Sequence, residues 1–113
     1  MAKTFFSGTA TLDNANLQTV YTPTTASKIV YVTKATLSIV THANAKFVAI
    51  QDNNGTPKVI AKHNDLTAAA GVPSVVTWDF GRRGVPLTTG KTLQVVSEAS
   101  GVAGYVYIEG YQE

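Results

Sequence analysis

The segment Gly90-Lys91-Thr92 is the part of the chain that most resembles a catalytic motif. A phosphate-binding loop requires a glycine, four further residues and then Gly-Lys-Thr or Gly-Lys-Ser, with the N-terminus of a helix directly after it. Val85 occupies the position of the first glycine, and Gly84 lies one residue too early. Leu93 and Val95 then alternate along the chain as they do in a strand. We therefore interpret Gly90-Lys91-Thr92 as a hairpin turn.

Metal-binding and acidic residues show no convergent pattern. His42 and His63 are the only imidazoles, and a zinc or iron site would need them to meet carboxylates in space. Four aspartates lie beside expected turns, where Asp ordinarily accepts hydrogen bonds from nearby backbone amides: Asp13, Asp52, Asp65 and Asp79. Hydrolysis by a carboxylate pair would need two acids facing one cleft, and nothing marks a partner for Glu109 or Glu113.

Nucleophilic catalysis also lacks its usual signatures. The chain has no Gly-x-Ser-x-Gly elbow, because Ser7 and Ser100 are each followed directly by a glycine and neither has the preceding one. It has no cysteine, which excludes disulfides, thiolate zinc sites and cysteine nucleophiles together. We therefore expect a protein that is not an enzyme, with no catalytic residue, metal ion or cofactor.

Aromatic residues near the C-terminus are better candidates for function. Tyr105, Tyr107 and Tyr111 share one parity of the last apolar run, and Val106 and Ile108 share the other. Rings on one face of a sheet can stack on sugars or bury against another protein. In the alternative arrangement the tyrosines point inward, and Val106 and Ile108 face a neighbour.

Two further pairs of residues are candidates for contact with a partner. Phe5 and Phe6 lie in an N-terminal arm, where they would be exposed unless the arm docked on a partner or on its own sheet, and we favour the partner. Arg82 and Arg83 form the only adjacent pair of basic residues, so they are either solvated turn residues or a contact for an acidic patch. The expected protein-interface residues are Phe5, Phe6, Arg82, Arg83, Tyr105, Tyr107 and Tyr111.

Composition predicts one β domain. The chain has 113 residues, the size of a single core, and its 14 Val and 16 Thr favour pleated strands over helices. Nine basic and seven acidic residues leave a net charge of only +2, without the basic cluster that nucleic-acid binding requires. The N-terminus lacks the apolar stretch of a secretory signal, and no run approaches the roughly 20 apolar residues of a membrane helix. We expect neither nucleic acid nor membrane as a partner.

The strand pattern runs through the whole chain. Lys28 to Thr41 is the longest run, and the parity of its apolar residues changes near Thr33, which indicates either two covered faces or a bulge. Asn53 to Pro57 contains Asn-Gly between two apolar runs and predicts a hairpin. Ser74 to Phe80 is a further strand, with Trp78 expected at the centre of the core. Asn64 to Val72 is expected to be a loop, with room for one helical turn.

Together these runs predict an all-β antiparallel two-sheet sandwich, jelly-roll-like, with about eight strands. Residues 1–12 are expected to be an N-terminal arm or a first short strand, the strand being a short pairing segment at Thr9 to Leu12. Residues 13–113 are expected to form the single β-sandwich domain.

The order of several runs resembles a known group of proteins. These runs are Val20-Tyr21-Thr22-Pro23, Lys28 to Leu37, Pro86 to Leu93 and Val106 to Tyr111. The order resembles that of small jelly-roll virion proteins of tailed bacteriophages, of the decoration or cement type. The likeness covers nearly the whole chain, and similar runs occur in phage fibre and adaptor modules.

The resemblance implies a structural role without catalytic residues. It implies a capsid decoration protein that stabilises the head shell by bridging subunits of the major capsid protein, as a homo-oligomer, dimer or trimer. Its location would be the exterior of the head, after synthesis in the cytoplasm of a bacterial host. The alternative is a carbohydrate-binding or receptor-binding jelly-roll module of a phage tail or fibre. A small enzyme or metal-binding jelly roll is the third interpretation.

Overall fold

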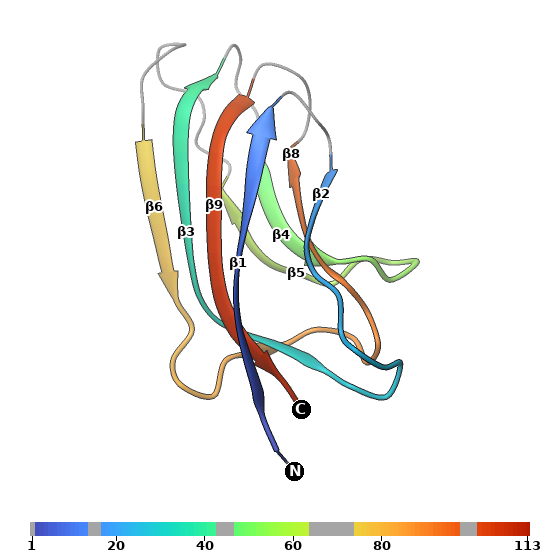
Figure 1. Ribbon diagram of the computed structural model, residues 1–113. Helices are drawn as coiled ribbons and strands as arrows, with labels where there is room; N and C mark the ends of the chain where they lie inside the picture. Colours follow the sequence, from blue (N-terminus) through green and yellow to red (C-terminus); the bar gives the residue numbers. More distant parts are fainter. Residues whose placement is uncertain (1, 14–16, 43–46, 64–73, 98–101) are drawn as a thin grey trace.

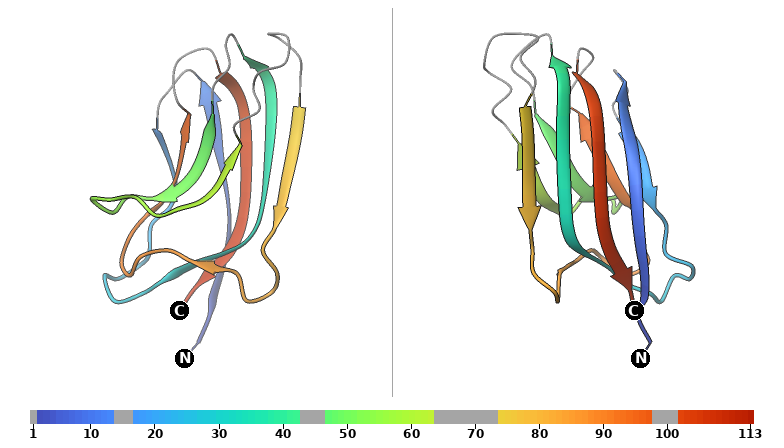
Figure 2. Two further views of the ribbon diagram at one scale, coloured as in Figure 1. Left: turned by 180° about the vertical axis from the view of Figure 1, so that it is seen from behind. Right: turned by 60° about the vertical axis from the view of Figure 1, so that its left-hand side comes forward.

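The computed structural model describes residues 2–13, 17–42, 47–63, 74–97 and 102–113. These residues form two antiparallel sheets that lie face to face, with the N- and C-termini close together at one end (Figures 1 and 2). The all-β sandwich predicted from the strand pattern is confirmed. The strands are β1 (Thr4–Asp13), β2 (Leu17–Tyr21), β3 (Val30–His42), β4 (Val48–Asp52), β5 (Val59–His63), β6 (Ser74–Asp79), β7 (Val85–Pro86), β8 (Leu93–Ser97) and β9 (Val102–Gln112).

The sheet topology is that of a jelly roll. One sheet has the order β1-β9-β3-β6, with β7 also paired to β3, and the other has the order β2-β8-β4-β5. The strands pair as a long antiparallel ribbon folded on itself: β1 with β9, β2 with β8, β3 with β6 and β4 with β5. The β3–β9 and β4–β8 pairings then close the ribbon into two layers. Sheets built in this way alternate core and surface residues along each strand.

The Asn-Gly hairpin is confirmed between β4 and β5. Asp52 organises this turn, because its Oδ1 atom accepts hydrogen bonds from the backbone N–H groups of Asn54 at 3.0 Å and Lys58 at 2.9 Å. The other carboxylate oxygen, Oδ2, accepts a hydrogen bond from the N–H of Thr88 at 2.9 Å. Asp52 thus ties the hairpin to the segment that precedes β8. Gly90, in that segment, has a φ of 76°, so the turn predicted for Gly90-Lys91-Thr92 is present. It is not a hairpin turn, because β7 pairs with β3 whereas β8 pairs with β2 and β4 in the other sheet.

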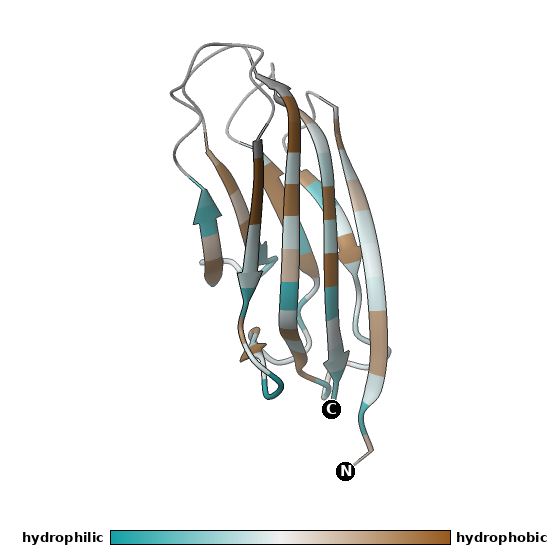
Figure 3. Cartoon of the chain, turned by 90° about the vertical axis from the view of Figure 1, so that its left-hand side faces the viewer, coloured by the Kyte–Doolittle hydropathy of each residue, from teal (hydrophilic) through white to brown (hydrophobic). Residues whose placement is uncertain are grey.

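The parity of the apolar residues in β3 changes at a bulge, which is one of the two explanations predicted from the sequence. The register between β3 and β9 shifts between Val32 and Lys34, which leaves Thr33 as the extra residue. Before the bulge the even-numbered Val30 and Val32 are buried, and after it the odd-numbered Ala35, Leu37 and Ile39 are buried. The bulge therefore keeps one continuous apolar face on a strand whose sequence changes phase. Brown and pale residues alternate along the long strands (Figure 3).

The core lies between the two sheets, and Trp78 is not at its centre. Trp78 is only partly buried, because among the described residues β6 lies at the edge of its sheet, with β3 as its one neighbour. The expectation that Trp78 forms the centre of the core is therefore wrong, although its inward direction is right. The buried apolar residues of the core are Leu12, Val30, Val32, Ala35, Leu37, Ile39, Val48, Ile50, Ala61, Leu87, Leu93, Val95, Val106 and Ile108.

Two expectations concern the segments that flank these strands. The strand β1 covers Thr4–Asp13 and pairs with β9 over its full length, so it is longer than the Thr9 to Leu12 pairing segment. The loop or helical turn expected for Asn64 to Val72 lies outside the described residues.

Candidate interaction surface

The surface of interest is the solvent side of the β1-β9-β3-β6 sheet, which we call the outer face. On β9 the even-numbered residues Val106 and Ile108 are in the core, so the odd-numbered residues project to the outer face. The register places Thr9, Tyr107, Thr36 and Thr77 in one row across the four strands. The outer face consists of Phe5, Ser7, Thr9, Thr11, Tyr31, Lys34, Thr36, Ser38, Val75, Thr77, Asp79, Tyr105, Tyr107, Glu109 and Tyr111.

Two of the three C-terminal tyrosines project from this face. Tyr105 is 58% exposed and Tyr107 is 41% exposed, whereas Val106 and Ile108 are fully buried. The alternative in which the tyrosines point inward is therefore wrong for this pair. Because they are two residues apart on one strand, the Cα atoms of Tyr105 and Tyr107 are roughly 7 Å apart.

Tyr111 shares the outer face but is only 2% exposed. Its ring stacks on that of Tyr31 at 4.8 Å and contacts that of Phe5 at 5.8 Å, and the Lys3 Nζ atom lies 4.4 Å from its centroid. The phenolic O–H donates a 2.6 Å hydrogen bond to the backbone carbonyl of Arg83. Tyr111 therefore anchors neighbouring segments, and its ring is not available for direct contact with a partner.

The two N-terminal phenylalanines point to opposite sides of β1. Phe5 lies on the outer face and is 74% exposed. Phe6 packs inward against the core, where its ring stacks on that of Tyr21 in β2 at 4.0 Å and an interplanar angle of 6°. Phe6 thus docks on the chain's own sandwich, and of the two rings only that of Phe5 is largely exposed.

Arg82 and Arg83 lie in the turn between β6 and β7, and both are exposed. The turn is bracketed by Gly81 and Gly84, whose φ angles of 83° and 76° favour glycine. Asp79 accepts a 2.9 Å hydrogen bond from the N–H of Gly81, which is the backbone role expected for an aspartate beside a turn.

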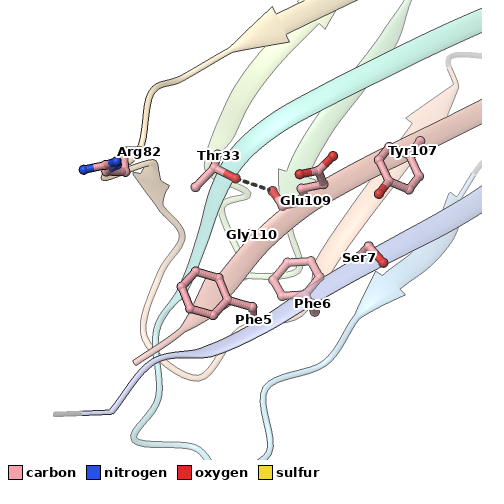
Figure 4. A pocket seen from close by; sticks show the side chains of 8 residues that line it. All are labelled: Phe5, Phe6, Ser7, Thr33, Arg82, Tyr107, Glu109 and Gly110. Carbon is pink, nitrogen blue, oxygen red and sulfur yellow. Dashed lines mark hydrogen bonds between the residues drawn. The ribbon is translucent and has the colours of Figure 1, made fainter.

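A shallow hollow of about 550 Å³ brings several of these residues together. Phe5 on β1 and Tyr107 on β9 border it on the outer face, and Glu109 lies on β9 near Tyr107 (Figure 4). Arg82 lies at one end, with its guanidinium pointing away from the rings. The floor is fixed by a 3.1 Å hydrogen bond from the Thr33 hydroxyl to the Glu109 carbonyl. The residues lining the hollow are Phe5, Phe6, Ser7, Thr33, Arg82, Tyr107, Glu109 and Gly110.

Four of these lining residues are among those predicted from the sequence, and the other four are not. Phe5, Phe6, Arg82 and Tyr107 were expected at a contact surface, and the structure places them around one hollow. Tyr105 lies outside it and borders a smaller hollow of about 250 Å³ beside Thr11. The contribution of Glu109 and Thr33 could not be recognised from spacing, because it depends on the β3–β9 register at the bulge.

Asp52 is a fully buried carboxylate outside this surface. Burial raises the pKa of its carboxyl, but hydrogen bonds from the Thr88 side chain and from the amides of Lys58, Thr88 and Asn54 outweigh burial and hold the pKa below 3.8. A carboxylate held in this ionised state by backbone donors has a structural role in the hairpin.

Metal-ligand clusters and membrane helices are both missing from the part of the chain that the structure describes. Within these residues no group of three or more His, Cys, Asp or Glu side chains could hold a metal ion. No helix in the same ranges is long and apolar enough to cross a membrane.

Comparison with known proteins identifies the fold by structure and not by sequence. No protein-family model and no curated protein matches the chain. A chain from the acidic stable capsid structure of Helicobacter pylori bacteriophage KHP30 has 13% sequence identity and a TM-score of 0.63, over 97% of this chain and 91% of that one. A chain of the cyanophage Pam1 capsid asymmetric unit has 13% identity and a TM-score of 0.47, over 96% and 84%. A chain of the disulfide-linked pili of Bacillus endospore appendages has 12% identity and a TM-score of 0.43, over 98% and 85%. The likeness to the KHP30 chain shows that a chain in a phage capsid structure has the same fold as this sandwich.

Proposed function

We propose that this chain is a virion protein of a tailed phage that decorates the head shell and stabilises it by bridging subunits of the major capsid protein. The observation that carries the proposal is the outer face, a rigid four-stranded surface with Phe5, Tyr105 and Tyr107 exposed on it. The fold likeness to a chain in the KHP30 capsid structure supports the virion setting. In this role the protein acts by contact and has no catalytic residue.

The outer face suits contact with a shell of many identical subunits. Many copies on one particle multiply a modest contact energy, so each copy needs a rigid surface rather than a deep pocket. Exposed aromatic rings supply most of the energy in such contacts, since they bury large apolar areas with few rotatable bonds. Phe5 and Tyr107 flank a hollow that can accept a side chain from the capsid subunit, with Glu109 and Arg82 at its border.

The test uses heads of the phage that encodes this chain. We expect the protein on purified heads in a fixed ratio to the major capsid protein, and heads made without it to rupture at a lower temperature. Adding the purified chain to those heads should restore their melting temperature. Recovery of the protein only in tail fractions would contradict the proposal.

Matched variants locate the contact. Tyr107→Ala and Phe5→Ser should fold normally, because both rings are exposed, and should fail to restore the heads. Val59→Ser is the control, since Val59 is 49% exposed on β5 of the opposite sheet. If Val59→Ser abolishes binding while Tyr107→Ala does not, the shell contacts the other sheet and the assignment of the outer face is wrong.

The second candidate function is carbohydrate or receptor binding by a module of a tail or fibre. The hollow favours it, because an aromatic ring beside a carboxylate is an arrangement that can stack on a sugar and bind its hydroxyl groups. This function predicts retention on a glycan array that is lost in Tyr107→Ala. Binding of the wild-type chain to heads but to no glycan would reject it.

A further inference from the structure

The strand β1 is an edge strand without the features that normally protect an edge. In the described part of the chain its sheet neighbour is β9, so the backbone groups on its other side have no strand partner. Proteins usually shorten an edge strand, bend it with a bulge, or place lysine or proline in it, because a long flat edge attracts a further strand. β1 has ten residues and an unbroken register with β9, and between Thr4 and Leu12 it carries no charge and no proline.

The other edges of the sandwich are protected. β2 has five residues and a register shift between Thr19 and Tyr21. β5 also has five residues, with a register shift in its pairing to β4 and Lys62 within it. β6 has six residues and ends at Asp79. The contrast singles out β1 as the edge at which a further strand can pair over the greatest length.

The sequence of β1 complements itself when two copies run antiparallel around a two-fold axis at Gly8. In this register Lys3 of one copy is the partner of Asp13 of the other, so residues of opposite charge are paired at both ends. Ser7 of one copy lies opposite Thr9 of the other, both on the outer face. Every other residue of β1 likewise lies opposite a residue whose side chain is on the same side of the sheet. Moving the axis to Ser7 or Thr9 removes the Lys3–Asp13 pairing.

Side-chain size also fits this register. Phe6 lies opposite Ala10 on the inner side and Phe5 opposite Thr11 on the outer side, so each large ring meets a small residue. Antiparallel pairing over Thr4 to Leu12 would form about eight backbone hydrogen bonds. The same surface patch is used by both partners, which gives a closed dimer rather than an open chain of subunits.

We propose that β1 is a homodimerisation edge at which a second copy of this chain adds its own β1, antiparallel, around a two-fold axis at Gly8. The two outer faces then form one continuous eight-stranded surface, with a hollow bordered by Phe5 in each half. This inference does not depend on the proposed function, because it follows from the edge alone. Its test uses only the purified full-length chain.

Disulfide cross-linking reads the register directly, because the natural chain has no cysteine. An equimolar mixture of Ser7→Cys and Thr9→Cys chains should form a disulfide-linked heterodimer on mild oxidation, since these positions lie directly opposite within the reach of a disulfide. Either variant alone should stay largely uncross-linked, because its own copies sit diagonally, about 7–8 Å apart. Efficient cross-linking of Ser7→Cys alone or Thr9→Cys alone would place the axis elsewhere and overturn the proposal.

Charge exchange gives a second readout that does not involve oxidation. Sedimentation or light scattering across a dilution series should show a dimer for the natural chain. Lys3→Asp or Asp13→Lys alone should weaken it about tenfold, because two attractive pairs become repulsive. The double variant with both changes should recover the natural affinity. Dimerisation through β1 would be refuted by a monomer at every concentration or by no recovery in the double variant. It would also be refuted if Thr9→Cys formed a disulfide with Val75→Cys on β6.

Discussion

Replacing Asp52 by asparagine should destabilise the fold through the hydrogen bonds that hold the β4–β5 hairpin. The buried carboxylate accepts three backbone N–H bonds of 2.9–3.0 Å, from Asn54, Lys58 and Thr88. The amide introduced by Asp52→Asn would keep one acceptor oxygen, and its NH₂ group would face an N–H donor. Hydrogen bonds to a charged acceptor contribute about 1.5–3 kcal/mol each, and neutral ones about half of that.

The expected loss follows from these bonds. The bond from the Thr88 amide disappears, the two other amide bonds become neutral, and the Thr88 hydroxyl has to turn to accept from the new NH₂ group. Relief from burying a charge returns part of the loss, which leaves about 2–3 kcal/mol. For a domain of this size, that corresponds to a fall in Tm of roughly 10 °C. Urea unfolding followed by tryptophan fluorescence measures the difference, with Trp78 as the reporter. Asp79→Asn is the matched control, since exposed Asp79 accepts one bond, from Gly81, and its loss should be within about 1 kcal/mol.

The pH dependence gives an independent check on Asp52. Its folded pKa lies below the ordinary value of 3.8, so the ionised carboxylate stabilises the protein above that pH. This contribution is lost as the pH falls from about 4 through the lowered pKa, and the gap between wild type and Asp52→Asn should then narrow. A gap below about 0.5 kcal/mol at neutral pH, or one that stays constant on acidification, would refute the role assigned to Asp52.

Two further substitutions test packing around β9. Tyr111→Phe should lower the free energy of unfolding by about 1 kcal/mol in urea titration, because it removes the hydrogen bond to the Arg83 carbonyl and keeps the ring stack; an unchanged midpoint would contradict this bond. Gly104→Ala should cost several kcal/mol or prevent folding, because its Cβ would press on the Ser38 carbonyl oxygen, whereas Gly55→Ala, with open space around it, should melt within a few degrees of wild type. Equal melting temperatures for these two alanine variants would show that β9 and β3 do not approach as closely as described.

Local patterns predicted the elements that depend on neighbouring residues. The β4–β5 hairpin follows from Asn-Gly between apolar runs. The change of parity within β3 predicted either two covered faces or a bulge near Thr33, and the β3–β9 register shows the bulge. The alternation of Tyr105 and Tyr107 with Val106 and Ile108 predicted that the two sets face opposite sides of the sheet, and the structure shows that the tyrosines face outward. The hairpin and the alternation along β9 are encoded within a few residues, whereas the choice between the open alternatives for β3 and β9 needed the pairing of distant strands.

Features that depend on sheet order were beyond such patterns. Trp78 has the residue type and parity of a core centre, yet β6 is an edge strand, which only the pairing of distant segments decides. Tyr111 has the parity of an exposed residue, yet Tyr31 and Phe5 cover it from neighbouring strands. The hollow brings Phe5 on β1 close to Arg82 in the β6–β7 turn. These two segments are distant in the sequence, and the sheet order β1-β9-β3-β6 places them on either side of β9 and β3.

Residue pattern was enough to establish an all-β chain, its Asn-Gly hairpin, and which residues along a strand share a face, because side-chain direction alternates residue by residue. The packing of distant segments was needed to establish which strands are neighbours, and hence which rings are covered, which carboxylate is buried and which edge is open. Strand order is set by contacts between opposite ends of the chain, such as Phe5 with Tyr111. A period of two along one strand carries no information about what lies beside it.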